Sequence, residues 1–128
     1  MNNVTFVGRI SNDISTFYSK DADPVARSIF NFAVPDMSMK KDKDGNYPCD
    51  YFRIATFGKT AENIEKYCSK GTKLLITGRV KNNNYEKDGV MVYGTEIIAD
   101  YVEFLETKKT SSEKYGFKFY ALERIELL

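Results

Sequence analysis

The chain has 128 residues, of which 42% are hydrophobic and 29% charged, a composition typical of one soluble globular domain. Nineteen basic and 18 acidic residues give a net charge of +1, which excludes a polybasic tail protein but not a local basic groove. Histidine is absent, which excludes histidine-based acid–base catalysis, Ser-His-Asp triads and His-ligated zinc. The sequence shows neither a membrane-spanning apolar run nor a signal peptide, so we expect a cytoplasmic protein.

Three strands are predicted in the first half of the chain. Residues 4–10 are rich in β-branched and aromatic side chains, and Gly8 inside this segment indicates a bulge or a sharp coil. After a bend, residues 15–19 resume the strand. Residues 25–34 are predicted as the second strand, in which Asn31 and Ala33 alternate with the last apolar residues, and residues 51–57 are predicted as the third.

A short helix is predicted after residue 57, where the spacing of the apolar residues changes. The residues that recur at helical spacing are Ala61, Ile64, Tyr67 and Cys68. Thr60 is the expected N-cap, and Gly71 follows the expected end of the helix. We therefore expect a helix between the third and fourth strands.

The second half of the chain predicts two more strands, at residues 74–81 and 95–105, with a protruding hairpin at about residues 80–95. Three strands, one short helix and two strands is the order of the OB-fold, a five-stranded Greek-key barrel. The predicted fold class is therefore all-β with one short helix. Residues 107–128 begin with a polar stretch and then become apolar again, so we expect a domain of residues 1–106 followed by a short C-terminal extension.

Aromatic and basic residues gather on the third predicted strand and on the hairpin. Tyr51, Arg53 and Phe57 are spaced at multiples of two, which places them on one face of a strand. Lys59 follows the end of that strand. Aromatic rings beside cations suit single-stranded nucleic acid, because bases stack on the rings while cations follow the phosphates.

The hairpin adds Tyr85, with Lys81 nearby. An alternative interpretation is that Phe57 packs in the core while Tyr51 and Tyr85 are ordinary amphipathic surface residues, since apolar spacing mostly reports packing. The pattern alone leaves both interpretations open.

Several motifs occur in an order and at a spacing that resemble the bacterial-type single-stranded DNA-binding proteins (SSBs). The motifs that carry the resemblance are Asn3–Ile10, Phe32–Val34, Asp50–Glu62, Tyr67–Gly71, Ile76–Val80, Thr95–Ala99 and Val102–Glu106. The resemblance covers about residues 1–106 and also implies the OB-fold.

The resemblance implies a set of nucleic-acid-binding residues. Tyr51 and Tyr85 stand where many members have Trp, and Phe57 matches a family Phe. A further Trp position of some members falls near Ser38, and Asn82–Asn84 replaces a more basic stretch, so weaker binding per subunit is expected. The residues assigned to the site in this way are Tyr51, Arg53, Phe57, Lys59, Lys70, Lys81 and Tyr85.

The resemblance also implies partners. The family usually forms homotetramers that pair their first strands, and a homodimer is the alternative. Family members commonly end in an acidic tip that recruits replication and repair enzymes, whereas residues 107–128 here hold five basic and three acidic residues. This difference puts the usual tail mechanism in doubt and indicates a phage or mobile-element member, or a tail that folds back. Glu126–Leu128 could imitate an acidic-apolar tip, but packing of the apolar tail on the barrel or a neighbour is the simpler interpretation.

The sequence thus predicts a cytoplasmic, nucleoid-associated protein that binds single-stranded DNA with little sequence preference. It would protect that DNA during replication, recombination or repair, without catalysis, metal or cofactor. The alternative from another class is an OB-fold protein-interaction module, such as a primosome-like or scaffold subunit. An RNA-binding OB-fold is a third interpretation, because stacking and phosphate contacts tolerate both nucleic acids.

Overall fold

The computed structural model describes residues 1–106, and the predicted extension of residues 107–128 lies outside the described residues. Strands dominate, with one helix after the fourth strand. The elements in chain order are β1 (Val4–Ile10), β2 (Ser15–Tyr18), β3 (Ala26–Pro35), β4 (Cys49–Phe57), α1 (Gly58–Tyr67), β5 (Lys73–Asn82), β6 (Tyr85–Lys87), β7 (Val90–Val92) and β8 (Thr95–Phe104).

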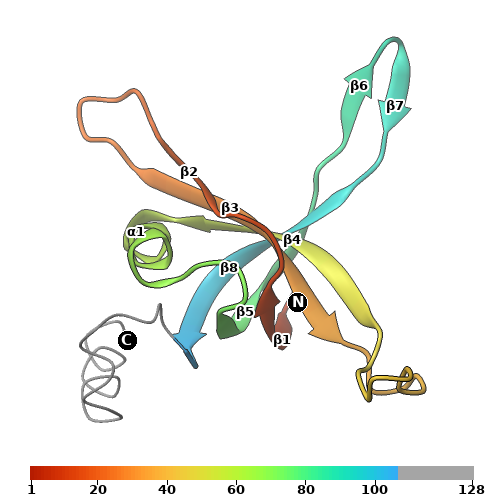
Figure 1. Ribbon diagram of the computed structural model, residues 1–128. Coiled ribbons are helices and arrows are strands. Elements are labelled where there is room, and N and C mark those ends of the chain that lie inside the picture. The colour runs from red at the N-terminus through yellow and green to blue at the C-terminus, as the bar shows by residue number, and fades with distance from the viewer. Residues whose placement is uncertain (107–128) are drawn as a thin grey trace, which may run out of the picture.

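A closed barrel is built from β1, β5, β8, β4 and β3, which lie side by side in that order. The sheet closes because β1 pairs with β5 along most of its length and with β3 at Arg9 and Ile10. β2 continues the sheet beyond β3, and β6 and β7 form a separate two-stranded sheet. This topology confirms the predicted OB-fold. Two hairpins, β2–β3 and β6–β7, project from the barrel (Figure 1).

Of the bulge or sharp coil predicted at Gly8, the bulge is wrong. β1 pairs with β5 in regular register through Gly8, and the register shift lies at Thr77 and Gly78 of β5 instead. Gly8 is required for a different reason, since a Cβ atom there would lie 2.2 Å from the carbonyl oxygen of Ala33. The glycine lets β1 pass close to β3, and this approach closes the barrel.

The core lies inside the barrel and is covered at one end by α1. Its buried members include Ile10, Phe30, Phe32, Ile54, Ile64, Leu74, Ile76, Val102 and Phe104. Strand residues supply most of this set, because alternate side chains of each barrel strand point inward. No helix within residues 1–106 is long and apolar enough to cross a membrane.

The predicted helix exists, but the predicted N-cap is wrong. α1 begins at Gly58, and its N-cap is Phe57, which makes no side-chain capping hydrogen bond. The reason is that β4 runs directly into the helix through Gly58, whose φ of 64° supplies the change in direction. Thr60 therefore lies inside the first turn rather than before it.

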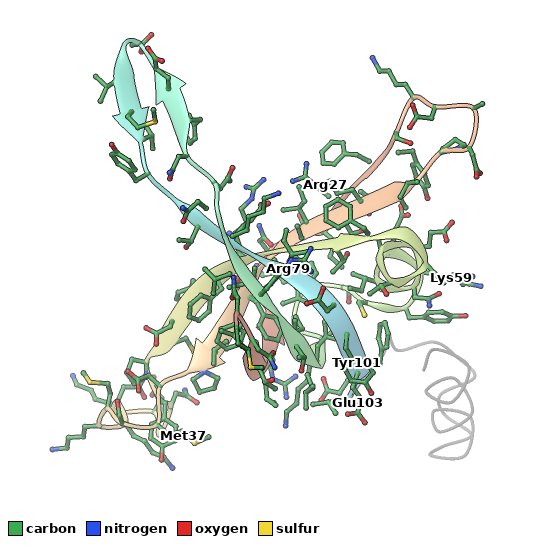
Figure 2. All side chains as sticks on the ribbon, turned by 180° about the vertical axis from the view of Figure 1, so that it is seen from behind. Arg27, Met37, Lys59, Arg79, Tyr101 and Glu103 are labelled. Carbon is green, nitrogen blue, oxygen red and sulfur yellow. The ribbon has the colours of Figure 1, made fainter. Side chains whose placement is uncertain are left out.

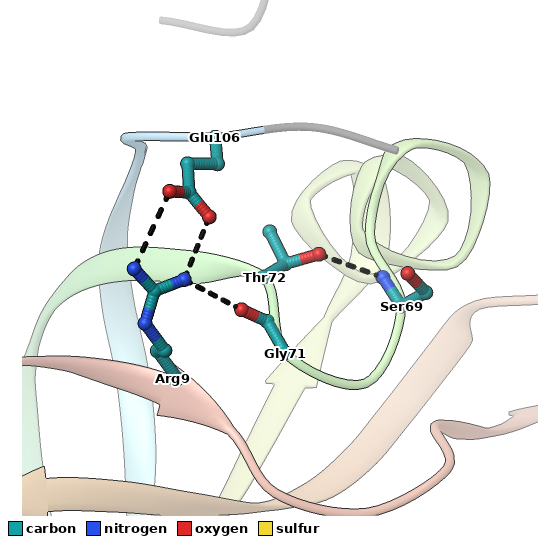
Figure 3. A network of polar contacts seen from close by, with 5 residues as sticks. All are labelled: Arg9, Ser69, Gly71, Thr72 and Glu106. Carbon is teal, nitrogen blue, oxygen red and sulfur yellow. Dashed lines mark hydrogen bonds and ion pairs between the residues drawn. The ribbon is translucent and has the colours of Figure 1, made fainter. Parts of the chain in front are cut away.

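A cluster of polar contacts ties the end of β8 to β1 and to the turn before β5 (Figure 3). Arg9 donates from Nη1 to Glu106 Oε1 at 2.8 Å and to the Gly71 carbonyl oxygen at 2.9 Å. Beside them, the Ser69 amide donates to Thr72 Oγ1 at 3.0 Å. These contacts lie where β5 begins and β8 ends, whereas the β6–β7 hairpin joins the other ends of the same two strands. The two ends of the barrel are therefore built differently.

Candidate nucleic-acid interface

The outer face of β4 carries two exposed rings and a guanidinium group. Tyr51 is 67% exposed and Phe57 is 45% exposed. The side chain of Arg53 lies between them in the chain and is 48% exposed. The intervening Phe52 points the other way and stacks on Phe6, with ring centroids 4.6 Å apart. The alternation of β4 thus gathers Tyr51, Arg53 and Phe57 on one surface.

A second arginine joins this surface from β3. Arg27 lies opposite Phe57 in the antiparallel register, and its guanidinium carbon lies 5.7 Å from the centroid of the Phe57 ring. Contacts of this kind are attractive because the face of an aromatic ring carries partial negative charge. Arg27 is not among the site residues predicted from the sequence. The signal was present, since a charged residue within a strand of apolar side chains has to face outward.

A buried carboxylate lies between the two arginines. Glu96 of β8 is only 8% exposed, and its Oε2 atom lies 3.4 Å from Arg53 Nε while its Oε1 atom lies 3.9 Å from Arg27 Nη2. Within the described residues, neither Glu96 Oε2 nor Arg27 Nε makes a hydrogen bond. The two contacts are therefore ion pairs that orient the guanidinium groups, and the two atoms without a hydrogen bond are themselves buried.

Lys81 completes the surface from β5. It is the direct partner of Glu96 in the antiparallel β5–β8 register, so both side chains lie on the same face. Three basic residues from three strands thus surround one acid. We call this surface the β4 face and define it by Arg27, Tyr51, Arg53, Phe57, Lys81 and Glu96.

The remaining residues that the sequence analysis assigned to the site lie at the edges of the β4 face or away from it. Lys59 is exposed on α1, one residue beyond Gly58, and Figure 2 shows it apart from Arg27. Tyr85 is 52% exposed and lies on β6, on the hairpin that follows Lys81. Lys70 follows α1 and lines a separate depression with Asp13, Ile14, Glu65, Cys68 and Ser69. The structure therefore does not bring Lys70 to the β4 face.

The loop between β3 and β4 forms a polar turn near Ser38, which matches the position of a Trp in some members of the family that the sequence resembles. Asp36 accepts hydrogen bonds from the Ser38 hydroxyl at 2.5 Å and from the Ser38 amide at 3.0 Å. These two bonds stabilise the carboxylate, so they lower the pKa of Asp36 below its ordinary value. The apolar side chains of this turn, Met37 and Met39, are both exposed. This loop offers no aromatic ring at residues 36–39 for a base to stack on.

The arrangement can hold a polyanion that carries flat rings. Exposed rings on the β4 face present surfaces for stacking, and the guanidinium and ammonium groups between them present charge to phosphates. Within residues 1–106, no cluster of acidic or cysteine side chains could hold a metal ion. The residues of the β4 face therefore favour binding of a nucleic-acid strand.

Comparison with known proteins agrees with this geometry. The model of the single-strand binding protein family matches residues 1–105. The single-stranded DNA-binding protein of Staphylococcus epidermidis is 34% identical over 113 residues, which cover 88% of this chain and 82% of the relative. That of Clostridium tetani is 37% identical over 91% of this chain and 79% of the relative. That of Oceanobacillus iheyensis is 37% identical over 84% of this chain and 65% of the relative. The chain belongs to the single-strand binding protein family.

Proposed function

We propose that the chain binds single-stranded DNA across the β4 face with little sequence preference, and that it protects this DNA during replication, recombination and repair. Bases stack on Tyr51 and Phe57. A further base then stacks on Tyr85 as the β6–β7 hairpin closes over the bound DNA. The observation that carries the proposal is the joint placement of exposed rings and cations on one barrel face.

The low sequence preference follows from which groups are accessible. Stacking and phosphate contacts do not distinguish bases, because every base has a flat face and every nucleotide a phosphate. Glu96 is the acid of the β4 face that could accept hydrogen bonds from base amino groups, but its carboxylate is buried between Arg27 and Arg53. The net charge of +1 supplies little bulk attraction, so affinity depends on local placement of charge.

The cations divide into two groups in this proposal. Arg27, Arg53 and Lys81 lie on the β4 face and contact phosphates of the strand that stacks on it. Lys59 is exposed at the start of α1, two residues beyond Phe57, and contacts a phosphate of the DNA near that ring. Lys70 lies beside a different depression, so it would contact DNA only if the bound DNA continued around the barrel.

The edge of β1 supports assembly of several copies. β1 pairs with β3 only at Arg9 and Ile10, so its residues from Val4 to Gly8 have one edge without a strand partner within the described residues. Unpaired strand edges favour pairing with another chain. Pairing of β1 with β1 of a second copy gives a symmetric dimer, and two dimers give the homotetramer expected from the sequence.

Titration of a fluorescein-labelled oligo-dT at low and high salt tests the proposed function. The wild type is compared with a Tyr51→Ala/Tyr85→Ala double variant and with Tyr101→Ala, which removes a 44% exposed tyrosine from β8 outside the β4 face. We expect the double variant to bind at least about 30-fold more weakly, since each stacked base contributes about 1–3 kcal/mol. Tyr101→Ala should bind like the wild type.

The salt series distinguishes this function from a protein-interaction module. The logarithm of the DNA affinity should fall linearly with the logarithm of salt, with a slope of about −0.7 per phosphate neutralised. Absence of oligo-dT binding by the wild type at low salt would reject the proposed function. A tenfold tighter complex with oligo-U of the same length would assign the β4 face to RNA instead.

A further inference from the structure

We propose that β2 carries a further base-stacking position, centred on Phe17, which extends the DNA track from the β4 face across β3 and onto the β2–β3 hairpin. The inference rests on the proposed function and adds a site to it. Phe17 is not among the site residues predicted from the sequence or implied by the resemblance.

Register places Phe17, Arg27 and Phe57 in one row. Phe17 of β2 is the direct partner of Arg27 of β3, and Arg27 is the direct partner of Phe57 of β4. Direct partners in antiparallel strands point to the same side of the sheet. With about 4.8 Å between neighbouring strands, the backbones of Phe17 and Phe57 lie about 10 Å apart, with Arg27 between them.

The row borders an open depression. Phe17 is 58% exposed, which is a larger fraction than that of Phe57. The depression has a volume of about 340 Å³, and its wall is mostly apolar. The residues that line it are Phe17, Tyr18, Ser19, Val25, Arg27 and Phe57. Because it shares Phe57 and Arg27 with the β4 face, the depression continues that face rather than forming a separate site.

The charge in the row identifies the occupant as a nucleotide. Arg27 is held over the Phe57 ring and near Glu96 by the contacts described above, and its side chain is still 42% exposed. Figure 2 shows Arg27 between the root of the β2–β3 hairpin and the β6–β7 hairpin. A nucleotide matches both the aromatic and the charged members of this row. Its base stacks on the Phe17 ring, and its phosphate accepts hydrogen bonds from the Arg27 guanidinium group.

The far end of the hairpin limits the track. Asp21 and Asp23 lie in the turn between β2 and β3 and repel phosphates, while Lys20 is the one cation in that turn. On its other side, Tyr18 directs its hydroxyl to Glu65 of α1 at 3.3 Å. The DNA therefore gains one further stacking position at Phe17, and the acidic turn keeps it from following the hairpin to its tip.

Two substitutions of the same side chain separate stacking from simple apolar contact. Phe17→Leu keeps an apolar side chain but removes the flat ring, whereas Phe17→Tyr keeps the ring. We expect oligo-dT affinity to fall by about five- to tenfold in Phe17→Leu and in Phe17→Ala, because one partly exposed stacking position is lost. Phe17→Tyr should retain wild-type affinity. Tyr101→Ala serves as the control, and circular dichroism verifies that each variant is folded.

Photocrosslinking locates the contact directly. Oligo-dT that contains 5-iodo-deoxyuridine is irradiated with the full-length wild type, and crosslinked peptides are identified by mass spectrometry. A crosslink at Phe17, beside those at Tyr51 and Phe57, is the expected result.

The outcomes distinguish this inference from the proposed function. Wild-type affinity in Phe17→Leu, together with crosslinks at Tyr51 and Phe57 but none at Phe17, would overturn the inference and leave the proposed function standing. Loss of affinity in Phe17→Ala but not in Phe17→Leu would also overturn it, since apolar bulk without a ring would then suffice. Absence of any oligo-dT binding would reject both.

Discussion

The two hairpins that project from the barrel in Figure 1 differ in what supports them. β2 lies on β3, a barrel strand, and the hydroxyl of Ser28 in β3 donates to the Ala61 carbonyl oxygen of α1 at 3.0 Å. Within residues 1–106, β6 and β7 pair only with each other, and their residues are exposed apart from the half-buried Val92. An isolated two-stranded ribbon is marginally stable in water.

The difference has an energetic consequence for binding. Tyr51, Phe57 and Phe17 are carried by strands that the barrel already holds in place. Tyr85 is carried by the ribbon, so part of its stacking energy is offset by the entropy of ordering the ribbon, about 1–2 kcal/mol for each residue fixed. A tyrosine on a barrel strand, such as Tyr51, should therefore contribute more to DNA affinity than a tyrosine on the ribbon, such as Tyr85.

The largest effect, on the free energy of unfolding, is expected when one glycine of the barrel and one at the base of the β6–β7 ribbon are each replaced by alanine. In Gly8→Ala the new Cβ atom would lie 2.2 Å from the Ala33 carbonyl oxygen, whereas in Gly94→Ala it would lie 3.3 Å from the Asn83 carbonyl oxygen. We expect Gly8→Ala to lower the free energy of unfolding by about 3 kcal/mol, because β1 and β3 have to separate. Gly94→Ala should change it by less than about 1 kcal/mol.

Urea unfolding followed by far-ultraviolet circular dichroism measures both values. Equal midpoints for the two variants would show that the barrel tolerates separation of β1 from β3 as easily as the base of the ribbon tolerates a methyl group.

A smaller effect is expected when Tyr51 and Tyr85 are replaced one at a time. Tyr51→Ala should weaken oligo-dT binding by about 10- to 30-fold, and Tyr85→Ala by about fivefold, because ordering the ribbon offsets part of the gain. Titrations at one salt concentration measure the two losses. A loss in Tyr85→Ala as large as that in Tyr51→Ala would mean that the ribbon is already ordered in the free protein.

The smallest effect concerns a third projection, the loop between β3 and β4. Ser38→Ala removes the hydroxyl that bonds to Asp36, so the pKa of Asp36 should rise toward its ordinary value. A lowered pKa in the folded state stabilises the protein above the pKa of the unfolded chain. That contribution is lost as the pH falls through the lower folded value, so the variants should differ in stability above about pH 4 and converge at lower pH.

Carboxyl titration by nuclear magnetic resonance measures this shift. Ser11→Ala is the matched control, because the Ser11 hydroxyl donates to the Asn31 carbonyl oxygen and not to a carboxylate. An unchanged Asp36 titration in Ser38→Ala would show that the hydrogen bond from the Ser38 backbone amide alone lowers the pKa of Asp36.

The fold could be predicted from the sequence because its signals are local. Alternation along residues 30–34, helical spacing from Ala61 and turn residues in the hairpins each report their own segment, and the order of the predicted elements specifies the OB-fold. The predictions that were wrong, Thr60 as N-cap and a bulge at Gly8, concern how one element meets another. Contact between β1 and β3 decides the role of Gly8, and no local pattern shows that contact.

The candidate site could be predicted only in part, for a related reason. Tyr51, Arg53 and Phe57 share one strand, so their common face follows from spacing. Arg27 and Glu96 reach the same face through register between segments far apart in the chain, and Phe17 reaches it through two successive strand pairings. Register between distant segments is set by packing of the whole barrel, which a single sequence does not display.

The buried carboxylate of Glu96 acts as a counterion for the guanidinium groups of Arg27 and Arg53 within the protein itself. A guanidinium that stays with Glu96 neutralises no phosphate, so the number of cations on the β4 face is an upper limit on the number of phosphates that they neutralise. The slope of the logarithm of affinity against the logarithm of salt counts every phosphate neutralised. A slope smaller than the cations of the site would give therefore means that arginine side chains have stayed with the Glu96 carboxylate instead of moving to a phosphate.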